Sequence, residues 1–239
     1  ITGTLLWELL LTYCRAICNG GTFGGKSARA LYRNSMLYCV PLVNPDGADL
    51  VAGAIPETSP EYVQAAAIAA VFPQIPFPDG WKANLRGVDL NLNYPASWDL
   101  AKEIKGNLGF DRAAPRDFPG NKPLDQRETA ALAAYTACIR PDILLAYHTQ
   151  GRVIYPGGRD LDPPGAKNLA EQFSEASGYA VEDVPPESSN AGFKDWFLRR
   201  FHRLGFTIEA GLGENPLPLS QLPQLILENE PLLAAALAD

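Results

Sequence analysis

A run of five apolar residues that leads directly into a histidine most constrains the fold of this chain. Ile143 to Tyr147 is apolar at every position, follows Pro141-Asp142, and is followed at once by His148. A strand that is apolar on both faces is typical of the centre of a sheet that helices cover on both sides. We therefore predict a central strand here. His148 then lies at its carboxyl end, where open α/β sheets gather their ligands.

A second apolar stretch ends in a carboxylate. Phe206-Thr207-Ile208 leads into Glu209, and Gly205 is expected to end the preceding helix. A carboxylate at the end of a buried strand is costly unless it is paired or used, which makes Glu209 a candidate for catalysis. A salt bridge to a nearby arginine is the alternative. For His148 a metal or acid–base role and a buried structural imidazole both stay open, whereas His202 is expected to be structural or at the surface.

Helical and strand patterns alternate along the chain. Helices are expected over 2–18, 61–72, 124–139, 164–177, 191–204 and 219–238, and strands over 35–43, 143–147, 153–155, 179–181 and 206–209. Asp125 is the expected cap of the third helix, Asn44-Pro45-Asp46-Gly47 predicts a tight turn, and 100–122 is expected to be a long surface loop. The alternation favours an α/β fold, a single domain over 1–239 with a mixed, largely parallel sheet flanked by helices.

Composition and charge argue against several classes of protein. The formal net charge is −7 and no basic stripe is present, so we expect no nucleic-acid partner. The apolar run within Leu5 to Leu11 is interrupted by Glu8, and a membrane span would need about 20 residues. Neither a zinc finger nor a disulfide framework fits the cysteine spacing, so buried thiols are expected at Cys14, Cys18, Cys39 and Cys138.

Polar side chains also occur within the apolar stretch from Gly87 to Pro95. Asp89 and Asn91 are two residues apart and share one face if the stretch is extended. Asp89 could orient a metal-bound histidine, and Asn91 could donate to a substrate carboxylate. Ordinary turn chemistry before Tyr94-Pro95 is the alternative for both. No Gly-x-Ser-x-Gly elbow or phosphate-binding loop is present, so serine catalysis lacks an identifiable nucleophile.

Several short segments follow one another in an order that can be compared with known families. They are Asn44-Pro45-Asp46-Gly47, Lys82-Ala83-Asn84-Leu85-Arg86-Gly87-Val88-Asp89-Leu90-Asn91, Pro119-Gly120 to Glu128-Thr129, Tyr147-His148-Thr149-Gln150-Gly151, Asp195-Trp196 and Thr207-Ile208-Glu209. Together they resemble the M14 zinc carboxypeptidase family over essentially the whole chain. The second segment and the stretch 186–196 look most like the bacterial γ-D-glutamyl-L-diamino acid peptidases, which cut peptidoglycan stem peptides.

The resemblance implies a catalytic centre with one zinc ion. His148 matches a zinc ligand, and Glu209 matches the general base that takes a proton from the zinc-bound water. Asp89 matches the carboxylate behind a zinc-ligating histidine. Such a metal generates a nucleophile and stabilises the oxyanion, while the carboxylate transfers the proton.

The same resemblance implies a peptide as substrate, a peptidoglycan stem peptide in the version it resembles most. Lys82 falls near the cation that polarises the scissile carbonyl, and Asn91 matches a contact to a substrate carboxylate. Leu92 and Thr149 are the other residues expected beside the substrate. The arginine that follows the asparagine in typical members is Leu92 here, which suits carboxylates arranged as in a D-glutamyl-diaminopimelate link.

Two further departures from the family are apparent. A His-x-x-Glu motif supplies two zinc ligands in the family, and it would lie immediately before Ile1. A catalytic zinc has three protein ligands, so the chain as given is expected to be amino-terminally truncated, to lack its first strands and to be inactive. The tyrosine that typical members carry before Asp195-Trp196 is replaced by the segment 185–190.

Two hypotheses from different classes follow. In the first, the parent protein is a metallopeptidase, a carboxypeptidase or a γ-D-glutamyl-diamino acid endopeptidase. In the second, it is a non-catalytic domain of the same fold that binds peptides or the cell wall. Glu209, Asp89 and His148 favour the enzyme, because a chain without catalysis has no physical need for a carboxylate at that strand end.

Overall fold

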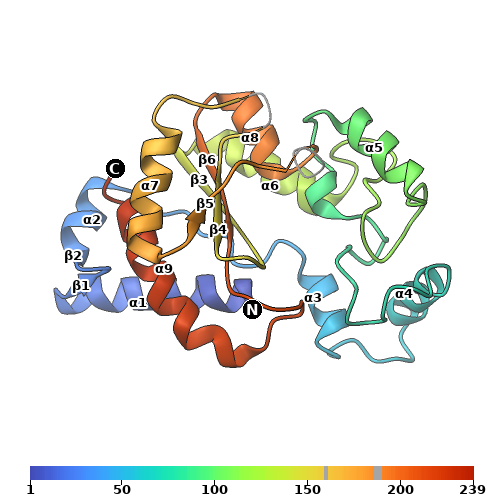
Figure 1. Cartoon of the computed structure of the whole chain (residues 1–239). Coiled ribbons are helices and arrows are strands. Elements are labelled where there is room, and N and C mark those ends of the chain that lie inside the picture. Colours follow the sequence, from blue (N-terminus) through green and yellow to red (C-terminus); the bar gives the residue numbers. More distant parts are fainter. Residues whose placement is uncertain (159–160, 186–189) are drawn as a thin grey trace. The chain divides into compact units, whose positions relative to one another are not determined.

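The described part of the chain forms two compact units, each with its own core. The computed structural model describes residues 1–158, 161–185 and 190–239. Unit 1 consists of Ile1–Pro41, Asp142–Val184 and Arg203–Asp239, and unit 2 of Leu42–Pro141 and Pro185–His202. Figure 1 shows their helices and strands with the labels used here.

Unit 1 contains all the strands of the described residues. Its elements are α1 (Thr2–Asn19), β1 (Thr22–Phe23), β2 (Lys26–Ser27), α2 (Ala28–Asn34), β3 (Ile143–His148), β4 (Val153–Pro156), α7 (Ala166–Ser177), β5 (Ala180–Val181), β6 (Leu204–Glu209), the 3₁₀ turn η3 (Leu219–Gln221) and α9 (Leu222–Ala236). Strands β1 and β2 form a small antiparallel hairpin, which the sequence reasoning missed. The other strands form one sheet in the order β3-β6-β4-β5.

The sheet is mixed, because β3 pairs with β6 and β4 with β5 in parallel, whereas β4 and β6 are antiparallel. Successive side chains of a strand point to opposite faces. On β6 the buried Phe206 and Ile208 share one face and Glu209 lies on the other. The prediction of an α/β fold with a mixed sheet flanked by helices is confirmed.

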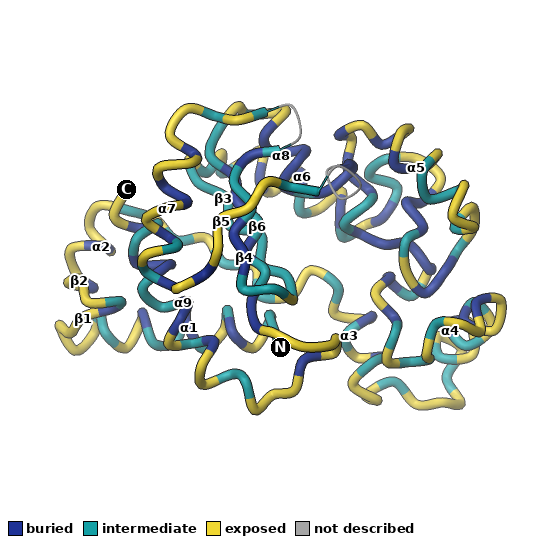
Figure 2. Tube along the Cα trace, viewed as in Figure 1, coloured by how far each residue is buried: buried dark blue, intermediate teal, exposed yellow. Residues whose placement is uncertain are grey.

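The apolar face of the sheet is covered by helices of unit 1. Phe206, Ile208 and Ile154 from the strands pack with buried residues of α1, α7 and α9 in one cluster. Strands β4 and β6 carry dark blue, buried segments in Figure 2. Gly20 ends α1 in the left-handed conformation with φ 67°. Ile1 occupies the N-cap position of α1 and makes no side-chain cap.

Unit 2 is built from helices and long ordered loops. Its elements are α3 (Pro45–Val51), α4 (Pro60–Ala69), the 3₁₀ turn η1 (Leu90–Leu92), α5 (Trp98–Asn107), α6 (Arg127–Ile139) and α8 (Phe193–Phe201). Small separate clusters make its core, one of which joins Leu50, Ala65 and Trp81. Ser59 caps α4 by accepting from the backbone N–H of Tyr62, and Pro60 follows it in the first turn.

The strand predicted over 35–43 is wrong. This segment belongs to no strand, and its apolar side chains alternate between half-buried and exposed, with Met36 74% exposed and Leu37 packed on the core. An apolar run becomes a strand only where a partner strand accepts its hydrogen bonds. The tight turn predicted at Asn44-Pro45-Asp46-Gly47 is a helix start instead. Asn44 caps α3 by accepting from the backbone N–H of Gly47.

Three further local predictions were also wrong. The expected loop over 100–122 contains most of α5. Asp125 does not cap α6, whose N-cap residue is Gln126, and instead accepts from the backbone N–H groups of Asn121 and Lys122. Helix α8 ends at His202, which is exposed, rather than at Gly205, which lies inside β6.

Strand β3 occupies an edge of the described sheet rather than its centre. Its apolar residues divide between two environments, because Ile143, Leu145 and Tyr147 pack against the helical core and Leu144 and Ala146 face the other way. An apolar run on both faces therefore did not distinguish an edge position from a central one.

The surface shows two features that bear on the sequence predictions. Cys14, Cys18 and Cys138 are exposed and Cys39 is half-buried, all four as free thiols, so the prediction of buried thiols was wrong.

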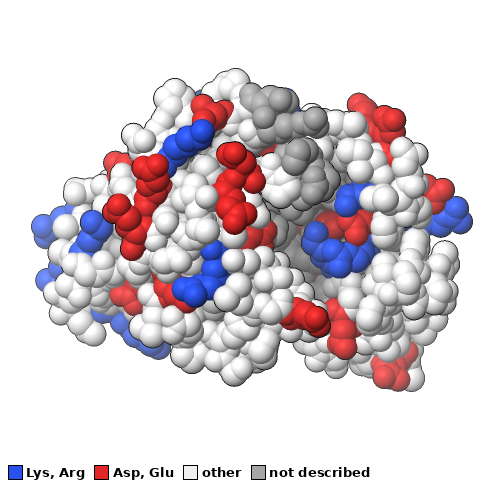
Figure 3. All heavy atoms as spheres, in the orientation of Figure 1, with Lys and Arg blue, Asp and Glu red and all other residues white. Residues whose placement is uncertain are grey.

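On the face drawn in Figure 3, acidic and basic side chains are interspersed. Among the described residues, no helix has the length and apolar character needed to cross a bilayer.

Candidate active site

The two candidates from strand ends lie side by side in unit 1. His148 and Glu209 are register partners in the parallel pair β3–β6, so their side chains leave the same face of the sheet. That face is opposite to Phe206 and Ile208 in the helical core. Both residues are half-buried, and the backbone N–H of Ala210 donates to the His148 carbonyl over 2.9 Å. The structure thus brings an imidazole and a carboxylate together, as the positions at the two strand ends suggested.

A tyrosine that the sequence reasoning missed shares this face. Val153 is the antiparallel partner of Glu209 and Tyr155 that of Thr207, so Tyr155 stands on the same face as Glu209. Burial raises the pKa of the Tyr155 hydroxyl, and the negative charges of Glu182 and Glu209 raise it further. The strand pattern of 153–155 gave the signal, because it places residues 153 and 155 on one face, but the pairing with β6 is not visible in the sequence.

Two loops beyond the strand ends are joined by one backbone hydrogen bond and one from a side-chain amide. The N–H of Gly151 donates to the Gly211 carbonyl over 2.9 Å, and the Asn215 amide donates to the Thr149 carbonyl over 3.1 Å. Gly211 has φ 81°, and a Cβ there would lie 2.6 Å from Cδ1 of Leu217, so only glycine fits this close turn. These contacts fix the backbone on which His148, Thr149 and Glu209 stand.

The loop after β3 is also anchored to α9 by a buried polar cluster. Arg152 pairs with Glu228 over 2.9 Å, and its guanidinium lies 5.6 Å from the centre of the Tyr179 ring. Asn229 donates to the Tyr179 hydroxyl over 3.0 Å. Burial raises the pKa of the Tyr179 hydroxyl well above its usual range. Glu228 is buried, and removing Arg152 would leave its carboxylate without this ion pair, so the pair anchors the loop that carries Thr149.

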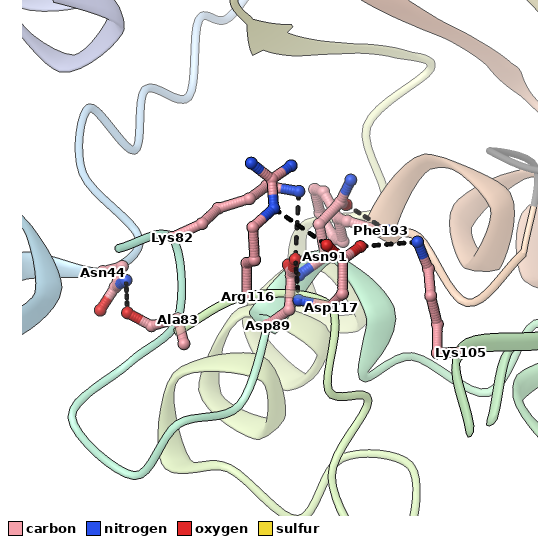
Figure 4. Close-up of polar contacts among 9 residues, drawn as sticks. All are labelled: Asn44, Lys82, Ala83, Asp89, Asn91, Lys105, Arg116, Asp117 and Phe193. Carbon is pink, nitrogen blue, oxygen red and sulfur yellow. Dashed lines mark hydrogen bonds and ion pairs between the residues drawn. The ribbon is translucent and has the colours of Figure 1, made fainter. Parts of the chain in front are cut away.

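The remaining candidates gather in unit 2 around the carboxylate of Asp89. This residue is 1% exposed and caps η1 by accepting from the backbone N–H of Asn91 over 3.2 Å. Its second oxygen accepts from the backbone N–H of Asp117 over 3.3 Å and pairs with the Lys82 ammonium over 3.1 Å. Asp89 is followed by the turn η1, so the stretch is not extended and the condition for the shared face of Asp89 and Asn91 is not met. Figure 4 shows these contacts.

Charge pairing sets the protonation of this group. The negative charge of Asp89 raises the pKa of Lys82, although burial and the positive charge of Arg116 act in the opposite direction. Burial alone would raise the pKa of Asp117, but hydrogen bonds and charge from Lys105 and Arg116 lower it. Lys105 lies 2.6 Å and Arg116 2.9 Å from this carboxylate. Both shifts favour the charged forms of Lys82 and Asp117 at neutral pH.

Asn91 and Leu92 stand on η1 beside this cluster. The Asn91 side-chain oxygen accepts from the backbone N–H of Phe193, the first residue of α8, over 3.2 Å. Its amide nitrogen keeps the donor that the sequence prediction assigned to a substrate carboxylate. Leu92 is half-buried and offers no charge. Of the segment expected to replace the family's tyrosine, residues 186–189 lie outside the described residues.

Buried amides hold the loops that present these residues. Asn84 accepts from the backbone N–H groups of Arg86 and Val88, both over 3.1 Å, and donates to Gln126 and Glu128. Asn93 is 0% exposed and donates to the carbonyls of Pro119 and Lys122 while it accepts from Thr129 over 2.7 Å. Sequence reasoning did not select either asparagine. An asparagine inside an apolar stretch was the available signal, because a buried amide needs partners.

A zinc site can be tested against the residues that the structure describes. His148 offers an imidazole next to the Glu209 carboxylate. Among the described residues, however, no group of three or more histidine, cysteine, aspartate or glutamate side chains could hold a metal ion. A catalytic zinc has three protein ligands and an open position. The described residues therefore do not make a complete zinc site.

Comparison with known proteins defines the class of this chain. The model of the family described as "Zinc carboxypeptidase", Peptidase M14, matches residues 3–231 and so spans both units. The chain belongs to the M14 zinc carboxypeptidase family. Carboxypeptidase A from Helicoverpa armigera has the same fold, with a TM-score of 0.56 and 18% identity over 83% of this chain and 51% of that chain.

Two bacterial proteins are similar over nearly the whole chain. "Gamma-D-glutamyl-L-diamino acid endopeptidase 1" of Lysinibacillus sphaericus is 40% identical over 95% of this chain and 55% of its own length. "Uncharacterized protein YqgT" of Bacillus subtilis (strain 168) is 36% identical over 94% of this chain and 58% of its own length. The chain thus spans little more than half the length of these relatives.

Proposed function

We propose that the natural protein containing these residues is a zinc-dependent peptidase that hydrolyses the γ-D-glutamyl-diamino acid bond of peptidoglycan-type peptides. The chain's residues 1–239 would belong to its catalytic domain. Glu209 takes a proton from the attacking water, and His148 is one of the zinc ligands. Lys82 and Asn91 contact the substrate, and Asp89 positions Lys82 through the 3.1 Å ion pair.

The observation that carries this proposal is the register pairing of His148 with Glu209 on the sheet face opposite to the core. A general base must lie within reach of the group it deprotonates, and a metal ligand beside a carboxylate meets that requirement. Zinc, where bound, would lower the pKa of water and polarise the carbonyl. The substrate class is supported by the 40% identity to a protein named as a γ-D-glutamyl-L-diamino acid endopeptidase.

The test uses the natural protein that contains these 239 residues and a peptide with a γ-D-glutamyl-diaminopimelate bond. We expect hydrolysis that is lost with a chelator and restored by zinc. Glu209→Gln should lower kcat by about 10²- to 10⁴-fold, the usual contribution of a general base, with little change in KM. Glu214→Gln is a matched control, because Glu214 is exposed on the following loop.

Other outcomes separate the alternatives. Binding of the peptide without any zinc-dependent cleavage would contradict the peptidase and favour a non-catalytic binding domain. The 239 residues on their own should bind zinc weakly, because His148 supplies one of the three ligands that are needed. Tight stoichiometric zinc in the isolated chain, measured by metal analysis after dialysis, would show that this reasoning is wrong.

A further inference from the structure

A group of charged side chains in unit 2 contains more cations than carboxylates. Lys82 pairs with Asp89 over 3.1 Å, while Lys105 and Arg116 both pair with Asp117, over 2.6 and 2.9 Å. Three cations thus share two carboxylates, in a chain whose formal net charge is −7. We call Lys82, Asp89, Lys105, Arg116 and Asp117 the charge cluster.

Burial within the charge cluster is uneven. The carboxylates lie inside, with the side chain of Asp89 2% and that of Asp117 17% exposed. Lys105 is 19% exposed, whereas Lys82 and Arg116 are both 47% exposed. The two accessible cations therefore stand above buried anions that hold them in place.

The accessible head groups lie next to each other. Figure 4 shows the Lys82 ammonium and the Arg116 guanidinium side by side. The charge of Arg116 also lowers the pKa of Lys82, which requires the two to be close. Like charges repel at this range, and an anion placed against both would relieve the repulsion.

Arg116 has N–H donors beyond the one that binds Asp117, and these could bind such an anion. Its ion pair with Asp117 uses Nε, and within the described ranges no contact occupies its two Nη groups. The two Nη groups of a guanidinium form a planar fork that matches a carboxylate with two parallel hydrogen bonds. Arg112, four residues earlier, binds Asp111 with both Nε and Nη2 and has no cation beside it in the described contacts.

The substrate of the proposed function has a carboxylate at a fitting place. In a γ-linked glutamyl residue the α-carboxylate is free and lies three carbons from the carbonyl of the scissile bond. Lys82 is the cation proposed to contact the substrate there, and Arg116 lies beside it. Leu92 stands where typical members have an arginine, so that position offers no cation for a carboxylate.

We propose that Arg116 is a specificity-determining residue that binds the free α-carboxylate of the γ-linked glutamyl residue, next to Lys82. The inference rests on the proposed function. It assigns substrate selection to the glutamyl side of the scissile bond. Peptides in which this carboxylate is an amide should be poor ligands, because the amide brings no charge to offset the two cations.

Equilibrium binding tests the site without depending on catalysis. γ-D-Glutamyl-diaminopimelate and its glutamyl α-amide are titrated calorimetrically into the natural protein that carries Glu209→Gln, which slows hydrolysis, with and without substitutions at Arg116. We expect the acid to bind about ten- to a hundredfold more tightly than the amide, the range of a hydrogen bond to a charged group. Arg116→Gln should remove this preference by weakening the acid alone. Arg116→Lys should keep part of it.

Arg112→Gln is the matched control, because Arg112 lies in the same loop and its side chain is 67% exposed. It should leave the preference for the acid unchanged. Equal affinity of the Glu209→Gln protein for acid and amide, or a preference that persists when Arg116→Gln is added to it, would overturn the inference. The proposed function fails separately, if the wild type hydrolyses neither peptide. Hydrolysis of both at equal kcat/KM would keep the function and reject the role of Arg116.

Discussion

The two groups of candidate residues are held in place by different means. In unit 1, His148 and Glu209 are positioned by the ladder of two adjacent strands, whose other face is covered by an apolar core. In unit 2, Lys82, Asp89 and Asn91 lie outside any sheet, and hydrogen bonds between loop segments hold them.

This difference predicts which group depends on apolar packing and which is sensitive to pH and to the loss of single polar partners. A strand pair backed by apolar side chains depends on packing, which is insensitive to pH and spread over many contacts. A loop network depends on a few buried polar groups, each of which is costly to leave without a partner. Three predictions test this contrast.

The largest effect is expected in the packing beneath the strand pair. Phe206 is fully buried and meets Phe173 edge to face at 5.0 Å, so Phe206→Ala should cost about 3 to 5 kcal/mol of unfolding free energy. Urea denaturation measures this loss. Tyr32→Ala, at an aromatic residue that is 63% exposed, should change stability by less than about 0.5 kcal/mol. Similar losses in both variants would show that packing does not support the strand pair.

A smaller loss is expected in the loop network. Asn93→Ala leaves the carbonyl of Lys122 and the hydroxyl of Thr129 without the partner they have now, which should cost about 1 to 3 kcal/mol. Hydrogen exchange should show reduced protection over residues 119–129. Asn121→Ala is the control, because Asn121 is exposed. A variant as stable as the wild type would mean that the loops are held by other contacts.

The smallest effect is a dependence on pH that belongs to the loop network. The pKa of Asp117 is lowered in the folded state, so its stabilisation is present above the unfolded value of about 3.9 and is lost as pH falls through the folded pKa. Asp117→Asn should remove a stabilisation of up to about 1 kcal/mol at neutral pH and flatten the acid limb. Unfolding free energies between pH 7 and pH 2.5 measure this dependence.

A control separates this effect from general acid sensitivity. Asp111→Asn should leave the pH profile unchanged, because Asp111 and Arg112 are exposed and screened by solvent. A profile of Asp117→Asn that still parallels the wild type would assign the acid sensitivity to other carboxylates.

Local patterns predicted much of the fold but not its pairings. Strand β3, strand β4 and helix α7 were predicted because each signal lies within a few neighbouring residues. The segment 35–43 has the same apolar character and is no strand, since a strand requires a partner that composition does not reveal. Helix α5 was missed because its polar sequence between glycine- and proline-rich segments suggested a loop.

The candidate site shows the same division between local and distant information. Glu209 and His148 could be selected from the sequence, because each polar residue ends an apolar run. Their placement on one sheet face depends on a register between segments about 60 residues apart, which only pairing decides. Arg116 carried no signal at all, since its meaning depends on Lys82 and Asp117 being beside it.

Periodicity and the order of motifs along the chain were enough to predict the α/β class, the family resemblance and the residue types available for catalysis. The tertiary structure decided which face His148 and Glu209 share, that Asp89 turns the chain at η1, and that two cations stand together above buried carboxylates. The physical reason is distance along the chain. Register, burial and charge pairing arise between segments that local propensity cannot relate to one another.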